Sequence, residues 1–349
     1  MAFIDIVLQE PSYGWKNEKG ELVVPTIKQL FDEAFRRINI FRDIRNWISL
    51  MSWLMATLML PFLYLFITEY FTWKLAIVFL FYAMIVMGTH GTIWFHRFCT
   101  HNAYTFSHPL FRFITQNLVI KTFPEEIYVI SHHVHHVKSD MPGDPYNPKG
   151  GFWYCMLSDV NHQSISKDLD EKDYNRAAHF MRNTGVSINT YEQYKNRGSV
   201  VTPTYAVLSW IGNWLFWYAA FYFIGGHALA TTIFSAALAW FILVRAFNYT
   251  GHGKGKEMHK EGIDFDRSNL SINQLRPGLF AGEWHNNHHL YPGSARAGFL
   301  SYQLDLAWIY IFCLKKIGAV SSYHNSHKDF LRKHYSNKPL NIRGQEERM

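Results

Sequence analysis

Long apolar stretches alternate with polar segments along the chain, at residues 47–68, 75–93, 205–224 and 228–247. Each stretch is close to the roughly 20 residues that an α-helix needs to cross a bilayer. Pro61 lies within the first stretch, so a kink is expected there. The hydrophobic pattern therefore predicts four transmembrane helices.

The connections between these stretches differ greatly in length. Only a few residues separate the members of each pair, so each pair is expected to form a helical hairpin. The polar segments 1–46, 94–204 and 249–349 hold nearly all of the Lys and Arg residues, and the positive-inside bias places them in the cytosol. We predict an all-α membrane protein with two transmembrane hairpins, 47–93 and 205–248, and a cytosolic helical cap. Both termini are expected in the cytosol.

Composition narrows the class of protein further. The net charge is +7, and the apolar stretches favour an anionic membrane surface or an acidic partner over nucleic acid. Three cysteines without paired spacing argue against a disulfide framework. The first residues lack an apolar signal core, so no cleaved signal peptide is expected. Segments 110–130 and 301–318 are apolar but interrupted by charges, which predicts helices either at the membrane interface or buried in the cap.

Histidine is frequent, at 19 residues, and its spacing is informative. Three short motifs are rich in histidine. HRFCTH follows the second stretch, SHHVHH lies in the middle of the predicted cap, and WHNNHH lies near the C-terminus. Positions i, i+3 and i+4 share one face of a helix, so each His-x-x-His-His is expected to aim three imidazoles at one point. The motifs supply His96 and His101, then His132, His135 and His136, then His285, His288 and His289.

Further spacing arguments concern the first motif, the end of the fourth stretch and two more histidines. His96 and His101 are five residues apart, a spacing that suits a helix end where the backbone turns. In NYTGH, Asn248 and His252 are spaced i and i+4 at the end of the fourth stretch, and could share a face aimed at the same cluster. For His90 and His133 we favour ordinary core or surface positions over a role at the cluster.

Two His-x-x-His-His motifs would arise by chance in this chain with odds on the order of one in several hundred. We therefore interpret the histidines of the three motifs as metal ligands. Imidazole suits Zn, Cu, Fe and Ni, and eight histidines in three motifs are enough for two ions with open positions. The cluster is expected where the helices leave the hydrocarbon. A substrate with an apolar tail and a polar head would meet a metal there. A metal transporter is the non-enzyme alternative, although transporters place their sites near the bilayer midplane.

The three motifs resemble the histidine boxes of the membrane fatty acid desaturases, in the stearoyl-CoA desaturase branch. NYTGH and the segment GDPYNPKGGFWY are similar to further elements of that branch. The resemblance implies two iron ions held by all nine histidines named above, His252 included, with Asn248 near one iron through a water. It also implies O2 as co-substrate and oxidation of a fatty acyl chain. The boxes are shared with hydroxylases and with decarboxylases that form terminal alkenes, so those products stay open.

The resemblance also implies partners and a location. The substrate would be a fatty acid or an acyl thioester in contact with membrane lipid. Fused family members carry a His-Pro-Gly-Gly haem signature, which this sequence lacks, so electrons are expected from a separate ferredoxin or cytochrome b5-like protein. The membrane would be the bacterial inner membrane or the endoplasmic reticulum. Carboxylates that could orient the ligating imidazoles, or be ordinary surface groups, are Asp140, Asp144, Glu125, Glu126 and Glu283.

Overall fold

A computed structural model describes residues 2–252, 284–300 and 303–335, and this part of the chain is mostly helical. One small sheet accompanies the helices, formed by β1 (Tyr104–Phe106) and β2 (Val320–Tyr323). The helices are α1 (Phe3–Ile6), α2 (Ile27–Ile38), α3 (Trp47–Leu65), α4 (Trp73–Phe81), α5 (Gly88–Gly91), α6 (Pro109–Gln116), α7 (Glu125–Lys138), α8 (Phe152–Met156), α9 (Ser158–Asn161), α10 (Glu171–Phe180), α11 (Tyr191–Arg197), α12 (Pro203–Gly251), α13 (His285–Leu290), α14 (Leu306–Lys316) and α15 (His327–Tyr335).

Within the described residues, three helical segments are long and apolar enough to cross a membrane. The first, Ile44–Tyr70, contains α3 and a π-helical end at Phe66–Tyr70. The second, Trp73–Thr100, joins α4 and α5 with two π-helical segments, Tyr82–Met87 and Thr92–Thr100. The third is α12, which contains both of the last two predicted crossings.

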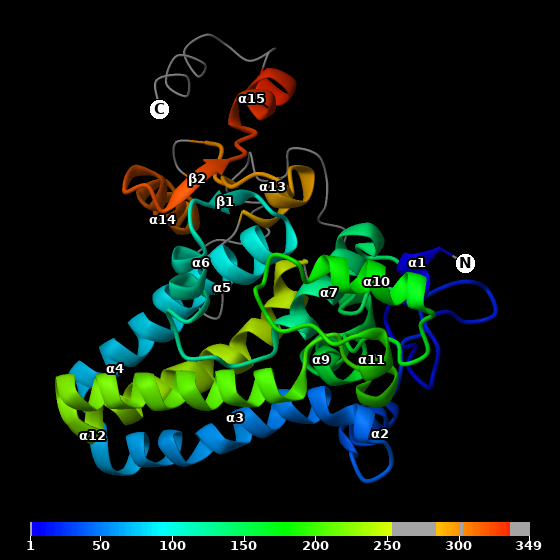
Figure 1. Cartoon of the computed structure of the whole chain (residues 1–349), viewed down its shortest axis with the longest axis horizontal. Helices are drawn as coiled ribbons and strands as arrows, with labels where there is room; N and C mark the ends of the chain where they lie inside the picture. Colours follow the sequence, from blue (N-terminus) through cyan, green and yellow to red (C-terminus); the bar gives the residue numbers. More distant parts are fainter. Residues whose placement is uncertain (1, 253–283, 301–302, 336–349) are drawn as a thin grey trace.

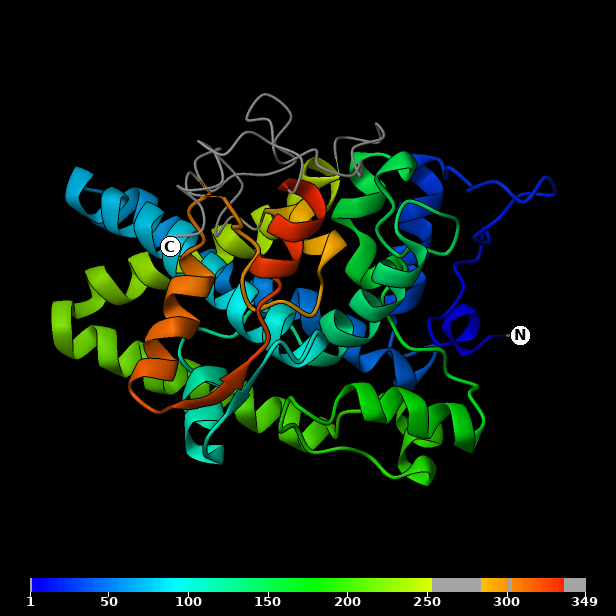
Figure 2. The same ribbon diagram turned by 90° about the horizontal axis from the view of Figure 1, so that it is seen from above.

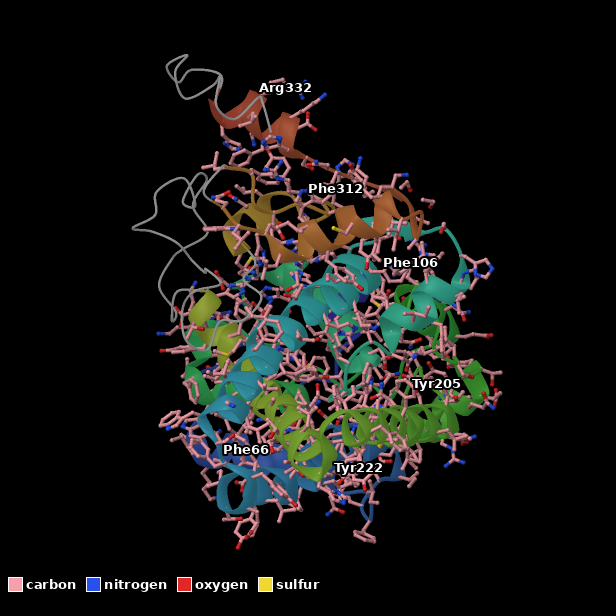
Figure 3. All side chains as sticks on the ribbon, turned by 90° about the vertical axis from the view of Figure 1, so that its left-hand side faces the viewer. Phe66, Phe106, Tyr205, Tyr222, Phe312 and Arg332 are labelled. Carbon is pink, nitrogen blue, oxygen red and sulfur yellow. The ribbon has the colours of Figure 1, made fainter. Side chains whose placement is uncertain are left out.

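The interruption within α12 lies at Gly225 and Gly226, whose backbone angles are not helical. Gly226 has φ +68° and ψ −167°, a conformation that is essentially restricted to glycine. Figure 1 shows the ribbon of α12 reversing direction, so that its two limbs run back toward the centre of the molecule. Figure 3 shows Phe66 and Tyr222, near the ends of α3 and of the first limb, at the end of the molecule opposite Arg332. One interrupted helix thus forms a hairpin.

The remaining helices collect around the other ends of these segments, as Figure 2 shows from above. The N-terminal segment is tied to this region by a bridge between Leu8 and Ile165. The antiparallel pairing of Tyr104 with Tyr323 draws the segment after α14 beside the segment that follows the first histidine box. These contacts join segments that are far apart in the sequence.

The predicted helix at 110–130 is two helices, α6 and α7. Pro124 is the N-cap of α7, and its ring favours a helix start over a helix interior. The predicted helix at 301–318 is shorter and corresponds to α14. Breaking the first of these helices lets α7 take its own direction and carry the second histidine box.

Candidate metal centre

Nine histidine side chains gather in two adjacent groups. Within each group the candidate ligand atoms all lie within 4.8 Å of one another. The rings of His136 and His289, one from each group, are stacked with centroids 4.5 Å apart. These nine are the histidines proposed as ligands from the sequence. The first group is His96, His101, His132, His136 and His288, and the second is His135, His252, His285 and His289.

His96 and His101 reach the same group because the second span ends in the π-helical segment Thr92–Thr100. The backbone N–H of His101 donates to the carbonyl of His96 over 3.1 Å, the i to i+5 pattern of a π-helix. The two rings then lie 5.0 Å apart. The predicted helix end is present, and its last turn is the wider π turn that brings residues five apart onto one face.

The second and third boxes each divide between the two groups, which corrects the expectation that each box aims at one point. In α7, His132 and His136 enter the first group and His135 enters the second. In α13 the division is reversed, because His288 enters the first group and His285 joins the second. Positions i+3 and i+4 are about 100° apart around a helix, so neighbouring positions can serve two centres.

The ring nitrogens within each group approach closely. In the first group, His96 Nε2 is 2.8 Å from His288 Nε2, and His136 Nε2 is 3.1 Å from His288 Nε2. In the second group, His285 Nε2 is 2.8 Å from His252 Nε2. These histidines come from the second span, α7, α13 and the residue that follows α12.

This donor set fits transition-metal cations. Burial lowers the pKa of His101, His132 and His288 well below the usual value, and neighbouring imidazoles lower it further, which favours the neutral form of these rings. The Nε2 atom of His101 is buried without a hydrogen-bond partner among the described residues. Such a concentration of buried acceptors is costly unless a cation binds them, and neutral imidazole is a common ligand of Zn, Cu, Fe and Ni.

Groups behind the imidazoles fix their orientation. Asp144 is fully buried, and its Oδ1 lies 2.9 Å from His135 Nδ1. Asp140 Oδ1 lies 3.4 Å from His252 Nδ1. His132 Nδ1 is hydrogen-bonded to the Tyr146 hydroxyl. Carboxylates and hydroxyls in these positions orient a ring and set its tautomer, which would leave Nε2 available to a metal ion.

Of the five carboxylates considered from the sequence, Asp140 and Asp144 thus lie at the site. Glu125 instead pairs with Lys121 at 3.3 Å, and Glu126 accepts a hydrogen bond from the Ser199 hydroxyl at 2.7 Å. Glu283 lies outside the described residues. Tyr146 was missed by sequence reasoning, and the available signal was its place two residues after Asp144 in the GDPYNP segment.

His90 and His133 belong to neither group, in keeping with their interpretation from the sequence. His90 Nε2 bonds the backbone carbonyl of Thr115 at 2.7 Å. The His133 ring stacks on Phe180 with centroids 4.0 Å apart. A histidine next to His132 in the sequence therefore has a packing contact in place of a position at the site.

A cavity opens beside the two groups. Its wall includes Asn248, which lies one helical turn before His252 on α12. Four of the nine histidines also line it, together with aromatic residues from α7 and α12. These histidines are His96, His132, His252 and His285.

The fold and the site define a helical membrane protein with a buried polyhistidine centre beside an apolar cavity. The family model described as fatty acid desaturase matches residues 71–312, which include all three histidine boxes. The chain belongs to the fatty acid desaturase family, and it is an oxidoreductase.

Curated relatives agree with this assignment. The chain is 27% identical over 289 residues to the icosanoyl-CoA 5-desaturase of Limnanthes douglasii, covering 80% of this chain and 72% of the relative. It is 29% identical over 259 residues to the acyl-CoA C20 Delta5-desaturase of Anemone leveillei, covering 73% and 75%. It is 26% identical over 266 residues to the sn-1 stearoyl-lipid 9-desaturase of Synechocystis, covering 72% and 73%.

Proposed function

We propose that the protein introduces a carbon–carbon double bond into a fatty acyl chain, using O2 and a pair of iron ions. The observation that carries the proposal is the juxtaposition of two histidine groups with a mostly apolar cavity. In the balanced reaction, the acyl chain loses two hydrogens, O2 takes up four electrons and becomes two waters, and an external donor supplies two electrons with two protons. When bound, the irons would supply the oxidising power that an unactivated C–H bond requires.

The protein's own residues would hold and shape this centre. One iron would be held by the first group and the other by the second, with Asn248 near one of them through a water. Asp144 and Tyr146 hold His135 and His132 in fixed orientations. Aromatic and aliphatic side chains along the cavity exclude water from the reacting carbons, which protects the reaction from side products.

We further propose four crossings, with both termini in the cytosol of a bacterial inner membrane or at the cytosolic face of the endoplasmic reticulum. The reversal at Gly225 and Gly226 supports two crossings within α12. The distribution of Lys and Arg supports cytosolic polar segments. The cap of segments 1–46, 94–204 and 249–349 would cover the iron site, and its basic surface would receive an acidic ferredoxin or cytochrome b5-like donor.

Decarboxylation to a terminal alkene and hydroxylation would use the same centre. Desaturation is preferred because the relatives described above are named as desaturases. A metal transporter is disfavoured by the position of the histidines at the ends of the spans, away from the middle of the bilayer. Products separate the enzymatic alternatives, since an alkene one carbon shorter with released CO2 would refute simple desaturation.

The experiment compares His288→Ala with His133→Gln. Each protein is purified from cells grown with defined fatty acids, its iron is counted, and cell lipids and volatiles are analysed by mass spectrometry. The His288 variant should lose iron and new unsaturated products. The His133 variant should keep both, because His133 lies in the same box but stacks on Phe180. Unchanged iron and product in the His288 variant would refute the proposal.

A further inference from the structure

Helix α2 has three faces of different character. One face is buried against the rest of the protein. A second face is exposed and apolar and consists of Ile27, Phe31 and Phe35, of which Phe35 is 65% exposed. A third face is polar and is exposed or half-buried. The buried residues are Leu30, Glu33, Ala34 and Arg37, and the polar ones are Lys28, Gln29, Asp32 and Arg36.

These faces follow from the periodicity of the helix. At about 100° per residue, Ile27, Phe31 and Phe35 lie within a sector of about 80°. The buried residues and the polar residues each fall within a separate sector of about 100°. A helix on the surface of a protein in water has two faces, an apolar one that is buried and a polar one that is exposed. The third face of α2 indicates a second apolar environment, besides the protein core.

The exposed apolar residues continue along the chain toward the first span. Phe41 is 98% exposed, and Ile44, where the candidate span begins, is also exposed. Single apolar side chains are common on surfaces in water, whereas a larger apolar surface marks contact with a membrane or a partner. The succession from Ile27 to Ile44 is therefore a candidate contact surface.

Hydrogen bonds hold α2 beside the start of that span. Asn46 directly precedes α3, and its Nδ2 donates to the carbonyls of Asn39 at 2.8 Å and Arg36 at 3.2 Å. The helix α2 also packs against α3 and α9, and Figure 1 shows it beside the end of α3. The C-terminal end of α2 is thus fixed at the level where the first span begins.

We propose that α2, together with Phe41 and Ile44, is an interfacial helix that binds the lipid leaflet in which the first span begins. Its apolar face is buried among the upper parts of the acyl chains, and its polar face meets headgroups and water. A lipid surface fits better than a protein partner, because the apolar residues lead directly into a membrane-spanning helix and are held at its start. The inference requires the first span to cross the membrane, and it does not depend on the proposed reaction.

The charges of α2 indicate what drives this binding. Lys28 pairs with Asp32 at 3.2 Å, and Arg36 pairs with Glu33 at 2.5 Å, so these charges cancel. Burial of the apolar face therefore supplies the binding, and anionic lipid is not required.

The bound helix would also be connected to the wall of the cavity. The side-chain amide of Asn161, in α9, donates to the Leu30 carbonyl of α2 over 3.0 Å. In the same helix α9, Ser158 and Asp159 line the cavity. A fixed depth of α2 in the leaflet would thus set the height of this part of the cavity wall relative to the membrane surface.

The test maps α2 with a fluorophore attached to single cysteines of the full chain in lipid nanodiscs. Cys313, which is exposed, is replaced by serine, whereas Cys99 and Cys155 are buried. An environment-sensitive fluorophore is placed at Phe35→Cys and, as the matched control on the same helix, at Asp32→Cys. Quenching by lipids that carry a nitroxide on the upper acyl chain is compared with quenching by iodide in the water.

An interfacial helix buries its apolar face by about 5–10 Å. The label at Phe35→Cys should therefore emit at shorter wavelength than the label at Asp32→Cys, and lipid nitroxide should quench it several-fold more. Iodide should quench the label at Asp32→Cys more strongly. Ile27→Cys lies on the same face as Phe35→Cys and should give the same result, so the comparison stands if one variant fails to fold.

Equal quenching of the labels at Phe35→Cys and Asp32→Cys would overturn the inference. So would a label at Phe35→Cys that neither quencher reaches, because a second copy or another protein would then cover this face. Leu58→Cys, at an exposed position within α3, is the reference for a side chain in contact with lipid. Lipid quenching at Leu58→Cys without quenching at Phe35→Cys would refute the interfacial helix and leave the span in place. These measurements need neither iron nor turnover, so their failure is distinct from failure of the proposed function.

Discussion

Asp144→Asn should release iron selectively from the second histidine group. The Asp144 carboxylate is fully buried and is contacted by three nitrogens, from His135 Nδ1 at 2.9 Å and from the backbone N–H groups of Asp140 at 3.0 Å and Tyr146 at 3.2 Å. An asparagine amide has one accepting oxygen, and its NH2 would face a donor. At least one of the three hydrogen bonds is therefore lost.

The size of the effect follows from that lost bond. A hydrogen bond to a charged group contributes about 1.5–3 kcal/mol, which corresponds to roughly 10-fold to 150-fold in metal affinity. Because His135 belongs only to the second group, the first group should keep its ion. Iron per purified protein should fall from about two toward one after dialysis against a weak chelator, a stoichiometry that follows from the separate ligand sets. Formation of unsaturated product should fall with it.

Glu126→Gln is the matched control, since Glu126 is a buried carboxylate of α7 that bonds Ser199 and no histidine. Its iron content should equal that of the wild type. Metal analysis by mass spectrometry, together with a thermal melt to confirm folding, provides the measurement. An Asp144→Asn protein that is folded, retains both irons through dialysis and is fully active would refute the orienting role assigned to this carboxylate.

Three further predictions concern the cavity, the α12 reversal and a buried acid. Gly91→Ala should shift the products toward shorter acyl chains, because both Gly91 and Trp240 line the cavity and an added Cβ would lie 2.9 Å from the Trp240 ring. Chromatography of the fatty acids checks this. Gly226→Ala should destabilise the protein by about 1–3 kcal/mol, measured by unfolding in denaturant, since φ +68° with ψ −167° strains any residue with a side chain. Burial raises the pKa of Glu126 from 4.5 to about 7, so between these pH values the folded state keeps a proton that the unfolded chain loses. The free energy of unfolding should therefore fall by about 3 kcal/mol as the pH rises from 4.5 to 7, and Glu126→Gln should abolish that fall.

The candidate ligands could be predicted from the sequence because histidine spacing and helix periodicity are local properties. All nine histidines named from the sequence fall in the two groups. Asp140 and Asp144 could also be proposed because they follow the second box closely. The long apolar stretches likewise indicated membrane helices, with the last two lying within α12.

Other features depend on long-range packing or unusual backbone geometry. The residues of the motif HRFCTH do not indicate that the helix widens to a π turn, yet that turn places His96 beside His101. The division of the second and third boxes between two groups depends on how α7 and α13 face one another. The pairing of Arg245 with Asp159 joins residues 86 apart in the chain, so it required the fold.

The interleaved contribution of α7 and α13 has a mechanical consequence. Each helix supplies a pair of ligands to one group and a single ligand to the other. A small rigid shift of either helix would therefore move ring nitrogens of both groups in the same direction. Changes in neighbouring loops or in the cavity wall would therefore leave the spacing of the two groups unaltered.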